Sequence, residues 1–223
     1  MKTVRYETEE AWMADRLKRI TGTRVKKITA KQRGTGVKIG YWELIAERLL
    51  KPKVPTDLDV FTDEDVALPD ELPMQRGSRL EAEALQAFKD ATGKEVDTSL
   101  IIWMREDNEN IALSPDGVVI GEPAAVENKC LKPALHIQAF ITKEIPETYH
   151  DQAMQYFVVN DELQSLYFMF YNPDFRVHAF FYIEMRRADH IAEIEALILH
   201  ERMVLEQVES VVASLLEGEP KGV

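Results

Sequence analysis

The spacing of apolar residues predicts helices in the N-terminal part of the chain. Apolar positions recur at helical spacing over 9–20 and again over 42–49. A short basic helix is expected between them, followed by a glycine-containing loop at 34–40. Residues 51–73 contain four prolines and many acidic side chains, so we expect them to form mainly loop.

Further along, the pattern alternates between helix and strand. Ser78 and Gly93 have the residue types of a helix start and a helix end. Asp189 is expected to cap a long helix that runs to about residue 216. Between these helices we expect strands at 98–104, 110–113, 117–120 and 124–130, a helix at 147–160, and strands at 163–171 and 176–185. This order predicts a layered α/β or α+β fold.

The charge of the chain is acidic but uneven. The formal net charge is −12, with 39 acidic and 27 basic residues among 223. This is unfavourable for general nucleic-acid binding, because non-specific affinity for DNA comes from phosphate neutralisation by Lys and Arg. However, 16–38 is strongly basic, whereas 57–71 and the C-terminal helix are acidic. A locally positive surface is therefore compatible with the composition.

Neither a membrane span nor a secretory signal is expected. No stretch has the roughly 20 apolar residues needed to cross a bilayer, and the N-terminus lacks an apolar central region. Cys130 is the single cysteine, which excludes an intramolecular disulfide and a four-cysteine metal site within one chain. These features predict a cytoplasmic protein.

Charged residues interrupt the apolar strands at 111–133. Asp116 begins an Asp-Gly pair between two apolar runs, which predicts a hairpin turn. Glu127 and Lys129 lie two apart, so a strand places both on one face. Taken separately, these are explained as a turn residue and as a solvated strand face with a weak ion pair. Together, the hairpin brings two carboxylates and one ammonium to the same sheet edge.

These groups match what metal-dependent phosphodiester hydrolysis requires. Mg²⁺ prefers hard oxygen ligands and keeps several waters, so Asp116 and Glu127 are candidate ligands. Lys129 is a candidate to position or deprotonate the attacking water and to offset charge in the transition state. The residues therefore indicate a Mg²⁺-dependent nuclease centre, in which Mn²⁺ is expected to substitute.

The same residues resemble a known family. Asp116 with Glu127-x-Lys129 resembles the PD-(D/E)xK nuclease signature. SPDG followed by ENKC is similar to the catalytic region of lambda-type phage alkaline exonucleases, the YqaJ-like viral recombinase group. Flanking segments also resemble this group over residues 12–185, in the family's order: W-x-x-x-RL-x-x-ITGT at 12–23, MQRGSRLEAEALQAF at 74–88, YHDQAMQYFVV at 149–159, and the strand at 163–171.

The resemblance implies roles for residues outside this core motif. Glu81 falls at the position of an active-site glutamate, and Gln152 at that of the catalytic-site glutamine. Arg16, Thr23 and Ser114 fall at positions that contact the 5′-phosphate of DNA. With Asp116, Glu127 and Lys129, they form the expected site.

The resemblance also implies a fold and an activity. The expected fold is a restriction-endonuclease-like α/β core with a central mixed sheet flanked by helices. A single nuclease domain over 1–223 would comprise a basic helical part at 1–50, a catalytic core at 74–185 and a C-terminal helix at 189–216. The implied activity is Mg²⁺-dependent 5′-to-3′ digestion of linear double-stranded DNA for phage-type recombination. A ring-shaped homotrimer, a phage single-strand annealing protein as partner, and a bacterial or phage-infected host cytoplasm are also implied.

The sequence leaves alternatives open. Glu81 could complete a capping box with Ser78, Gln152 could be an ordinary polar position, and Arg16 could be a solvated basic residue. The chain could also be a PD-(D/E)xK endonuclease or a non-catalytic DNA-binding recombination accessory protein. Asn128 departs from the family, in which an apolar residue usually separates the catalytic acid from the lysine. We expect it to find polar partners at a sheet edge or subunit contact.

Overall fold

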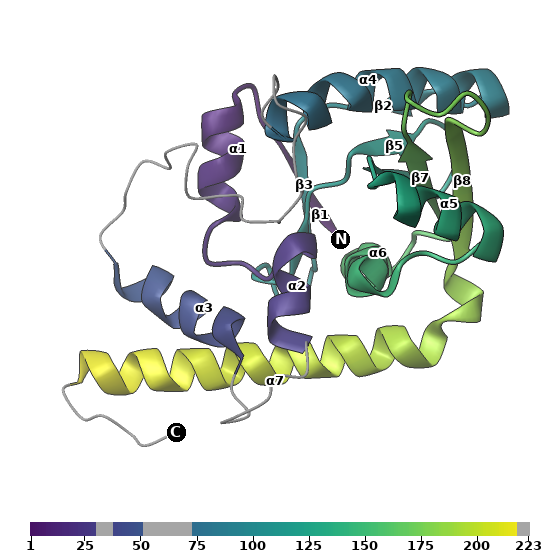
Figure 1. The fold of residues 1–223 in the computed structure, drawn as a ribbon. Coiled ribbons are helices and arrows are strands. Elements are labelled where there is room, and N and C mark those ends of the chain that lie inside the picture. Colours follow the sequence, from purple (N-terminus) through teal and green to yellow (C-terminus); the bar gives the residue numbers. More distant parts are fainter. Residues whose placement is uncertain (30–37, 51–72, 218–223) are drawn as a thin grey trace.

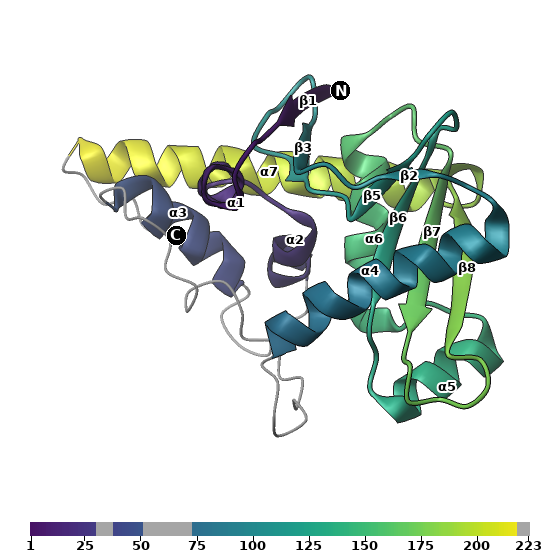
Figure 2. The same ribbon diagram turned by 90° about the horizontal axis from the view of Figure 1, so that it is seen from above.

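A mixed five-stranded sheet forms the centre of the fold (Figures 1 and 2). The computed structural model describes residues 1–29, 38–50 and 73–217. The strand order is β2-β5-β6-β7-β8, in which β6 and β7 are parallel and every other pair is antiparallel. The strands are β2 (Val96–Asp97), β5 (Gly117–Val119), β6 (Ala124–Lys129), β7 (Ser165–Tyr171) and β8 (Phe180–Arg186). The predicted α/β fold with a central mixed sheet is confirmed.

The two parallel strands are joined by helices, because parallel neighbours need a long crossover connection. α5 (Pro133–Thr142) and α6 (Glu147–Val159) form this connection. The sequence does not predict α5, although proline stands in its first turn and its C-cap, Lys143, has a left-handed φ of 58°. α6 confirms a predicted helix, and its residues from Ala153 to Val159 are all buried. α6 is therefore an interior helix.

Helices cover both faces of the sheet. On one face, Phe88 of α4 (Pro73–Thr92) packs with Val126 and Tyr167 in a small apolar cluster. On the other face, α6 and α7 (Ile191–Leu216) pack in the main core, which includes Phe168 and Leu205. Figure 1 shows α4 along one side of the sheet and the long α7 along the other. The central strand β6 is thereby covered on both faces.

Strands before and after α4 in the chain form a second, antiparallel sheet. Its order is β1-β3-β4, with β1 (Lys2–Arg5), β3 (Ile101–Met104) and β4 (Ala112–Leu113). The short strands β1 and β2 are not predicted from the sequence. Three helices complete the N-terminal part: α1 (Glu9–Arg16), α2 (Gly22–Thr29) and α3 (Ile39–Leu49). α2 packs against α6, and α3 packs against α7.

The first helix is shorter than predicted. The helix expected over 9–20 ends at Arg16, and Lys18 has a left-handed φ of 64°. Ile20 instead forms a β-bridge with Ile111 and is fully buried. Burial of this side chain against the second sheet outweighs the helical periodicity of the segment.

Two predicted helix caps are wrong. The helix expected to begin at Ser78 begins at Pro73, where proline is favoured, so Ser78 lies within α4. The capping-box alternative for Glu81 is therefore also wrong. Asp189 lies in a short 3₁₀ helix before α7, and His190 occupies the N-cap position.

The remaining boundaries differ at loops. The strand expected at 176–185 begins at Phe180, because the Asn172 N–H donates to the Ala179 carbonyl at 2.8 Å and closes a turn. The loop predicted at 51–73 lies outside the described residues, except for the proline that begins α4.

The loop predicted at 34–40 is described only from residue 38, and its end is wrong, because Ile39 begins α3. In the described ranges, no helix is both long enough and apolar enough to cross a membrane.

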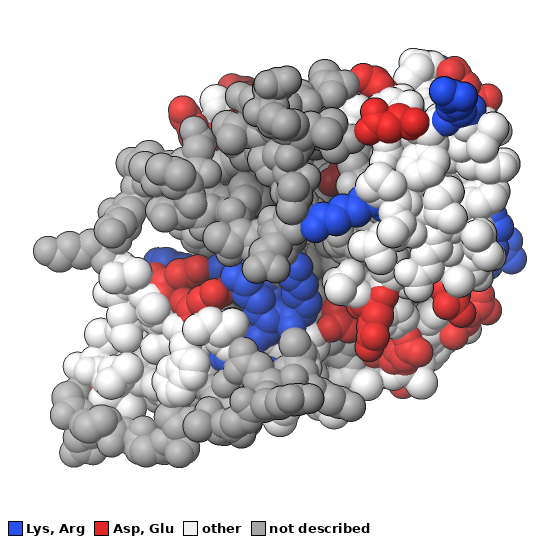
Figure 3. Space-filling view, in the orientation of Figure 1, with Lys and Arg blue, Asp and Glu red and all other residues white. Residues whose placement is uncertain are grey.

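Much of the positive charge near the N-terminus is ion-paired. Arg24 and Lys27 of α2 lie 2.5 and 3.1 Å from Glu47 and Glu43 of α3. Lys and Arg side chains nevertheless gather over α2 in the middle of the face shown in Figure 3, with acidic side chains beside them. The positive surface is therefore local.

A carboxyl group is buried between α6 and α7. Glu201 is 0% exposed and accepts a hydrogen bond from Gln155 Nε2 at 3.3 Å. Glu201 Oε1 and the single side-chain oxygen of Gln155 are both buried without a hydrogen-bond partner among the described residues. Burial raises the pKa of Glu201 to about 8, so its carboxyl is protonated at neutral pH.

Replacing Glu201 with glutamine is expected to stabilise the protein increasingly as the pH rises. The folded pKa of about 8 lies above the ordinary value of 4.5, so the wild type loses stability as the pH rises between these values. Each pKa unit corresponds to about 1.4 kcal/mol, and the neutral amide of Glu201→Gln avoids this loss.

Denaturant unfolding between about pH 5 and about pH 8 measures the effect. Glu206→Gln, at an exposed position of the same helix, is the matched control and should keep the wild-type pH dependence. A wild-type pH dependence for Glu201→Gln would contradict a buried, protonated carboxyl.

Candidate active site

The β5–β6 hairpin brings Asp116 and Glu127 together. Gly117 pairs with Val126, so Asp116 and Glu127 follow as the next positions across the hairpin. Asp116 Oδ2 accepts a hydrogen bond from the Asn128 N–H at 2.7 Å. A Cβ on Gly117 would lie 2.3 and 2.9 Å from side chains of β2 and β6, so only glycine permits this close approach. The hairpin turn predicted at Asp116-Gly117 is wrong, because β4 and β5 lie in different sheets and do not pair. The hairpin that brings Asp116 to Glu127 turns between β5 and β6.

The carboxylate of Glu127 is the centre of a hydrogen-bond network. The residue is 2% exposed. Its Oε1 lies 3.0 Å from Lys129 Nζ and accepts a hydrogen bond from Gln152 Nε2 at 2.6 Å. Its Oε2 accepts a hydrogen bond from the Tyr156 hydroxyl. The structure thus brings together Glu127, Lys129 and Gln152, as the sequence predicts.

Tyr156 is a site residue that sequence reasoning missed. It lies four positions after Gln152, on the same side of α6. That spacing was the available signal, but tyrosine in an apolar helix is ordinarily interpreted as core. Tyr156 is indeed 0% exposed, and only its hydroxyl reaches the charged cluster.

Negative charge around Glu127 is only partly compensated. Burial, Glu127 and Glu81 raise the pKa of Asp116 well above its ordinary value. Burial and Glu127 also raise the pKa of Glu81, which reaches the site from α4. Burial alone would lower the pKa of Lys129, but Glu127 and Asp116 raise it above its ordinary value. Lys129 is therefore an ammonium in this site.

The donor set suits a hard divalent cation. Within the part of the chain that the structure describes, no three His, Cys, Asp or Glu side chains form a ready-made metal site. Mg²⁺ does not require one, because it binds through one or two carboxylates and keeps several waters. The raised pKa values of Asp116 and Glu81 reflect burial and repulsion that a cation would offset. The carboxylates therefore fit Mg²⁺ or Mn²⁺.

The N-terminus of α2 approaches this cluster. A Cβ on Gly22 would lie 2.8 Å from Leu113 Cδ1 and 3.4 Å from Gln152 Cγ, so glycine allows the close contact. Thr23 follows in the first turn, exposed, with its Oγ1 3.4 Å from Thr21 Oγ1. A helix N-terminus presents free amide donors, which favour an anion.

Arg16 also lies close to the carboxylates, and Ser114 precedes Asp116 by two residues. The Arg16 guanidinium stacks over the Trp12 ring at 4.4 Å. Burial lowers the pKa of Arg16, and the nearby Asp116 and Glu127 partly offset this. The side chain is therefore not simply solvated. Ser114 Oγ is buried and has no hydrogen-bond partner among the residues described.

Asn128 lies in the interior strand β6 but beyond its paired part with β5, which ends at Val126. On that side Asn128 meets the side chain of Asp116 and not a neighbouring strand, so the expected edge position holds only locally. The Asn128 backbone N–H bonds Asp116, and its Nδ2 lies 3.8 Å from Cys130 Sγ. Its Oδ1 is buried without a hydrogen-bond partner in the described ranges. The backbone N–H of Asn128 thus holds the Asp116 carboxyl group in place. Nothing in the structure explains why a polar side chain stands at position 128.

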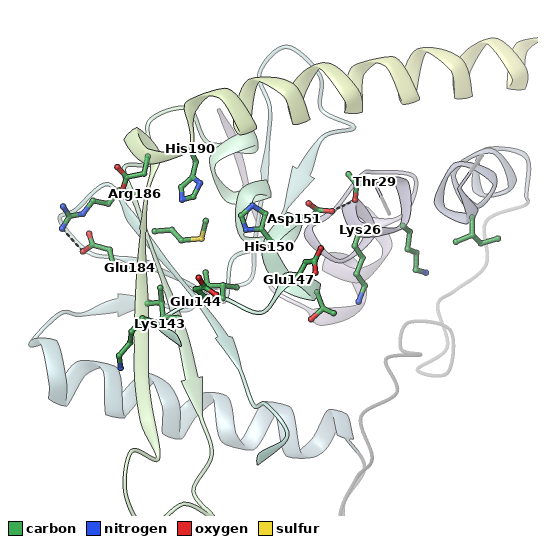
Figure 4. A pocket seen from close by; sticks show the side chains of 17 residues that line it. Lys26, Thr29, Lys143, Glu144, Glu147, His150, Asp151, Glu184, Arg186 and His190 are labelled. Atoms are coloured by element: carbon green, nitrogen blue, oxygen red, sulfur yellow. Dashed lines mark hydrogen bonds and ion pairs between the residues drawn. The ribbon is translucent and has the colours of Figure 1, made fainter. Parts of the chain in front are cut away.

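A pocket of about 1150 Å³ lies beside α6 (Figure 4). Its lining includes Lys26 and Thr29 of α2, Asp151 of α6, and Glu184 and Arg186 of β8. Thr29 points toward Asp151 and donates a hydrogen bond to it, and Arg186 pairs with Glu184 at 3.1 Å. None of the predicted catalytic or phosphate-binding residues lines this pocket, so it is separate from the candidate active site.

The mixed sheet and the charged hairpin together define a PD-(D/E)xK nuclease fold. The chain belongs to the YqaJ-like viral recombinase domain family, whose family model matches residues 11–162. The family resemblance seen in the sequence is therefore confirmed, and this family comprises nucleases of recombination. None of the curated proteins compared with the chain matches it.

Solved structures share the fold over nearly the whole chain. LHK-Exo in complex with dAMP has a TM-score of 0.75 and 25% identity, covering 94% of this chain and 97% of that chain. A structure of the alkaline exonuclease LHK-Exo from Laribacter hongkongensis has a TM-score of 0.72 and 24% identity, with the same coverage. A phage-related exonuclease from Haemophilus somnus 129PT has a TM-score of 0.52 and 13% identity, covering 86% and 95%.

Replacing Asp116 with asparagine is expected to raise the melting temperature when EDTA removes divalent cations. The folded pKa of Asp116 lies well above the ordinary 3.8, so the wild type loses stability as the pH rises from 3.8 through the folded pKa. The neutral amide avoids this loss and keeps an oxygen for the Asn128 N–H. We expect the melting temperature to rise by roughly 2–4 °C for each kcal/mol of unfolding free energy that the substitution regains.

Thermal unfolding near neutral pH measures this change. Asp90→Asn, at an exposed position of α4, is the matched control and should leave the melting temperature unchanged. Added Mg²⁺ should stabilise the wild type more than Asp116→Asn. A lower melting temperature of Asp116→Asn in EDTA would contradict the charge repulsion described here.

Proposed function

We propose that this protein is a Mg²⁺-dependent exonuclease that digests linear double-stranded DNA from the 5′ end and exposes single strands for recombination. The observation that carries this proposal is the convergence of an ammonium, an amide and a second carboxyl group on Glu127. Lys129 and Gln152 reach its Oε1 at 3.0 and 2.6 Å, and Asp116 faces it across the hairpin. The similarity to LHK-Exo, an alkaline exonuclease, supports an exonuclease rather than an endonuclease.

Each residue of the cluster would have a distinct task. Asp116 and Glu127 would hold the metal, and Glu81 would support its coordination shell. Bound Mg²⁺ supplies charge stabilisation at the phosphate oxygens and lowers the pKa of a bound water. Lys129 is protonated in these surroundings, so it would donate hydrogen bonds to the attacking water or to a phosphate oxygen. Gln152 orients Glu127 through its Oε1.

The 5′-phosphate would bind beside the metal site. Arg16 offers two parallel charge-assisted hydrogen bonds, which suit a phosphate group. Thr23 and the free amides of the first turn of α2 add donors. The buried hydroxyl of Ser114, which has no partner among the described residues, is a further donor. These groups would set the distance between the DNA end and the scissile bond.

Assembly would compensate for the acidic composition. With a net charge of −12, one chain attracts DNA weakly, and its positive surface is local. We therefore propose that the single nuclease domain over 1–223 forms a ring-shaped homotrimer that encloses the duplex and acts with a phage single-strand annealing protein.

The first test removes the three central side chains. Asp116→Ala and Glu127→Ala should abolish hydrolysis, because each removes a hard oxygen ligand. Lys129→Ala should slow it by about 10²-fold or more while sparing metal binding. The assay is digestion of end-labelled linear duplex with Mg²⁺, with EDTA as the metal control and closed circular DNA as the test for an endonuclease.

Glu95→Ala, at an exposed site away from the cluster, should retain full activity in the same assay. Wild-type turnover by any of the three variants would exclude the proposed roles. Cleavage of closed circles would favour the endonuclease alternative, and an absence of metal binding would favour the non-catalytic accessory protein.

The second test concerns the DNA end. Wild-type protein should degrade duplex with 5′-phosphate ends much faster than the same duplex with 5′-hydroxyl ends. Arg16→Ala should erase most of this preference and leave metal binding intact. Lys26→Ala, in the same basic segment, should weaken overall DNA binding without changing the preference. Equal rates on both ends by the wild type would refute a phosphate site.

The third test measures assembly. Light scattering at micromolar concentration should give a mass near three times 25.6 kDa. A clean monomer would contradict the ring but not the catalytic assignment, because all residues proposed for chemistry come from one chain.

A further inference from the structure

The Tyr156 hydroxyl contacts both proposed metal ligands, Glu127 and Asp116. Its hydroxyl bonds Glu127 Oε2 and lies 3.2 Å from the Val126 carbonyl oxygen. The same hydroxyl accepts from the backbone N–H of Asp116 at 3.4 Å. One oxygen atom therefore contacts the strand that carries Glu127 and the segment before β5 that carries Asp116.

The chemistry of a hydroxyl decides which of these bonds forms. A phenol has one hydrogen to donate, so it cannot serve Glu127 and Val126 fully at once. The charged carboxylate is the stronger acceptor, so the hydrogen points to Glu127 Oε2. The lone pairs remain for the Asp116 N–H. Tyr156 is thus a donor to one ligand and an acceptor from the backbone of the other.

The core fixes the position of this hydroxyl. Tyr156 is 0% exposed, and its ring meets Trp103 edge to face at 6.4 Å. One turn earlier on the same helix, Gln152 bonds the other oxygen of Glu127. α6 therefore holds both oxygens of Glu127, which fixes the plane of the carboxylate and the direction of its remaining lone pairs.

We propose that Tyr156 is a positioning residue of the metal site, which sets the orientation of Glu127 and the distance of Asp116 from it. It touches the ligands and not the metal or the substrate, so it acts through them. Groups that orient metal ligands in this way commonly contribute about 10- to 100-fold to metal affinity or activity. This inference rests on the proposed function, because it requires a cation at Asp116 and Glu127.

Tyr156→Phe tests the inference, because it removes the hydroxyl and keeps the buried ring. Mn²⁺ binding is measured by electron paramagnetic resonance titration of the purified protein, without DNA. We expect the Kd for Mn²⁺ to rise by about 10-fold or more. The Mg²⁺ concentration for half-maximal DNA digestion should rise in parallel, while KM for DNA stays near wild type.

Tyr167→Phe is the matched control. Tyr167 is 9% exposed and belongs to the apolar cluster on the other face of the sheet. It should leave Mn²⁺ binding unchanged. Tyr156→Phe with wild-type Mn²⁺ affinity would overturn the inference and leave the proposed function standing. Wild-type protein that binds no Mn²⁺ would overturn both. Wild-type protein that binds Mn²⁺ with an affinity that Tyr156→Phe weakens, but that cuts no DNA, would overturn the proposed function alone.

Discussion

The buried carboxylate of Glu127 constrains the position of α6 and of the charged side chains around it. At 2% exposure it has lost its hydration, which costs several kcal/mol unless neighbouring groups compensate. Lys129, Gln152 and Tyr156 provide this compensation. Two of them come from α6, whose position is set by apolar packing against the sheet. Packing of the core and compensation of the charged site therefore depend on each other. If α6 were displaced, the Glu127 carboxylate would lose its hydrogen bonds from Gln152 and Tyr156.

The compensation is incomplete, and this is where the site differs from a structural ion pair. Asp116 and Glu81 both have raised pKa values, because burial and neighbouring carboxylates oppose their charge. A fold selected for stability alone would replace such groups with neutral ones. Three carboxylates around one ammonium leave an excess of negative charge, which a bound cation would offset.

Some of this could be predicted from local sequence, and some could not. The shared face of Glu127 and Lys129 follows from strand periodicity, and Asp116 does meet Glu127. The hairpin turn predicted at Asp116-Gly117 is wrong, because the strands before and after it belong to different sheets, which turn chemistry cannot reveal. The place of Gln152 came only from family resemblance, because its contact with Glu127 depends on how α6 docks. Tyr156 was missed for the same reason, since nothing local distinguishes it from a core residue. Ile20 shows the opposite case, in which a long-range bridge overrides helical spacing.

The central claim is that Asp116 and Glu127 hold a divalent cation beside Lys129. Crystals of the protein grown with Mn²⁺ and a 5′-phosphorylated duplex, with the metal located by its anomalous scattering, test this most directly. The account predicts Mn²⁺ bound by oxygens of Asp116 and Glu127, at about 2.0–2.2 Å as expected for small divalent cations. Mn²⁺ bound elsewhere, or no anomalous signal between these two carboxylates at saturating Mn²⁺, would contradict it.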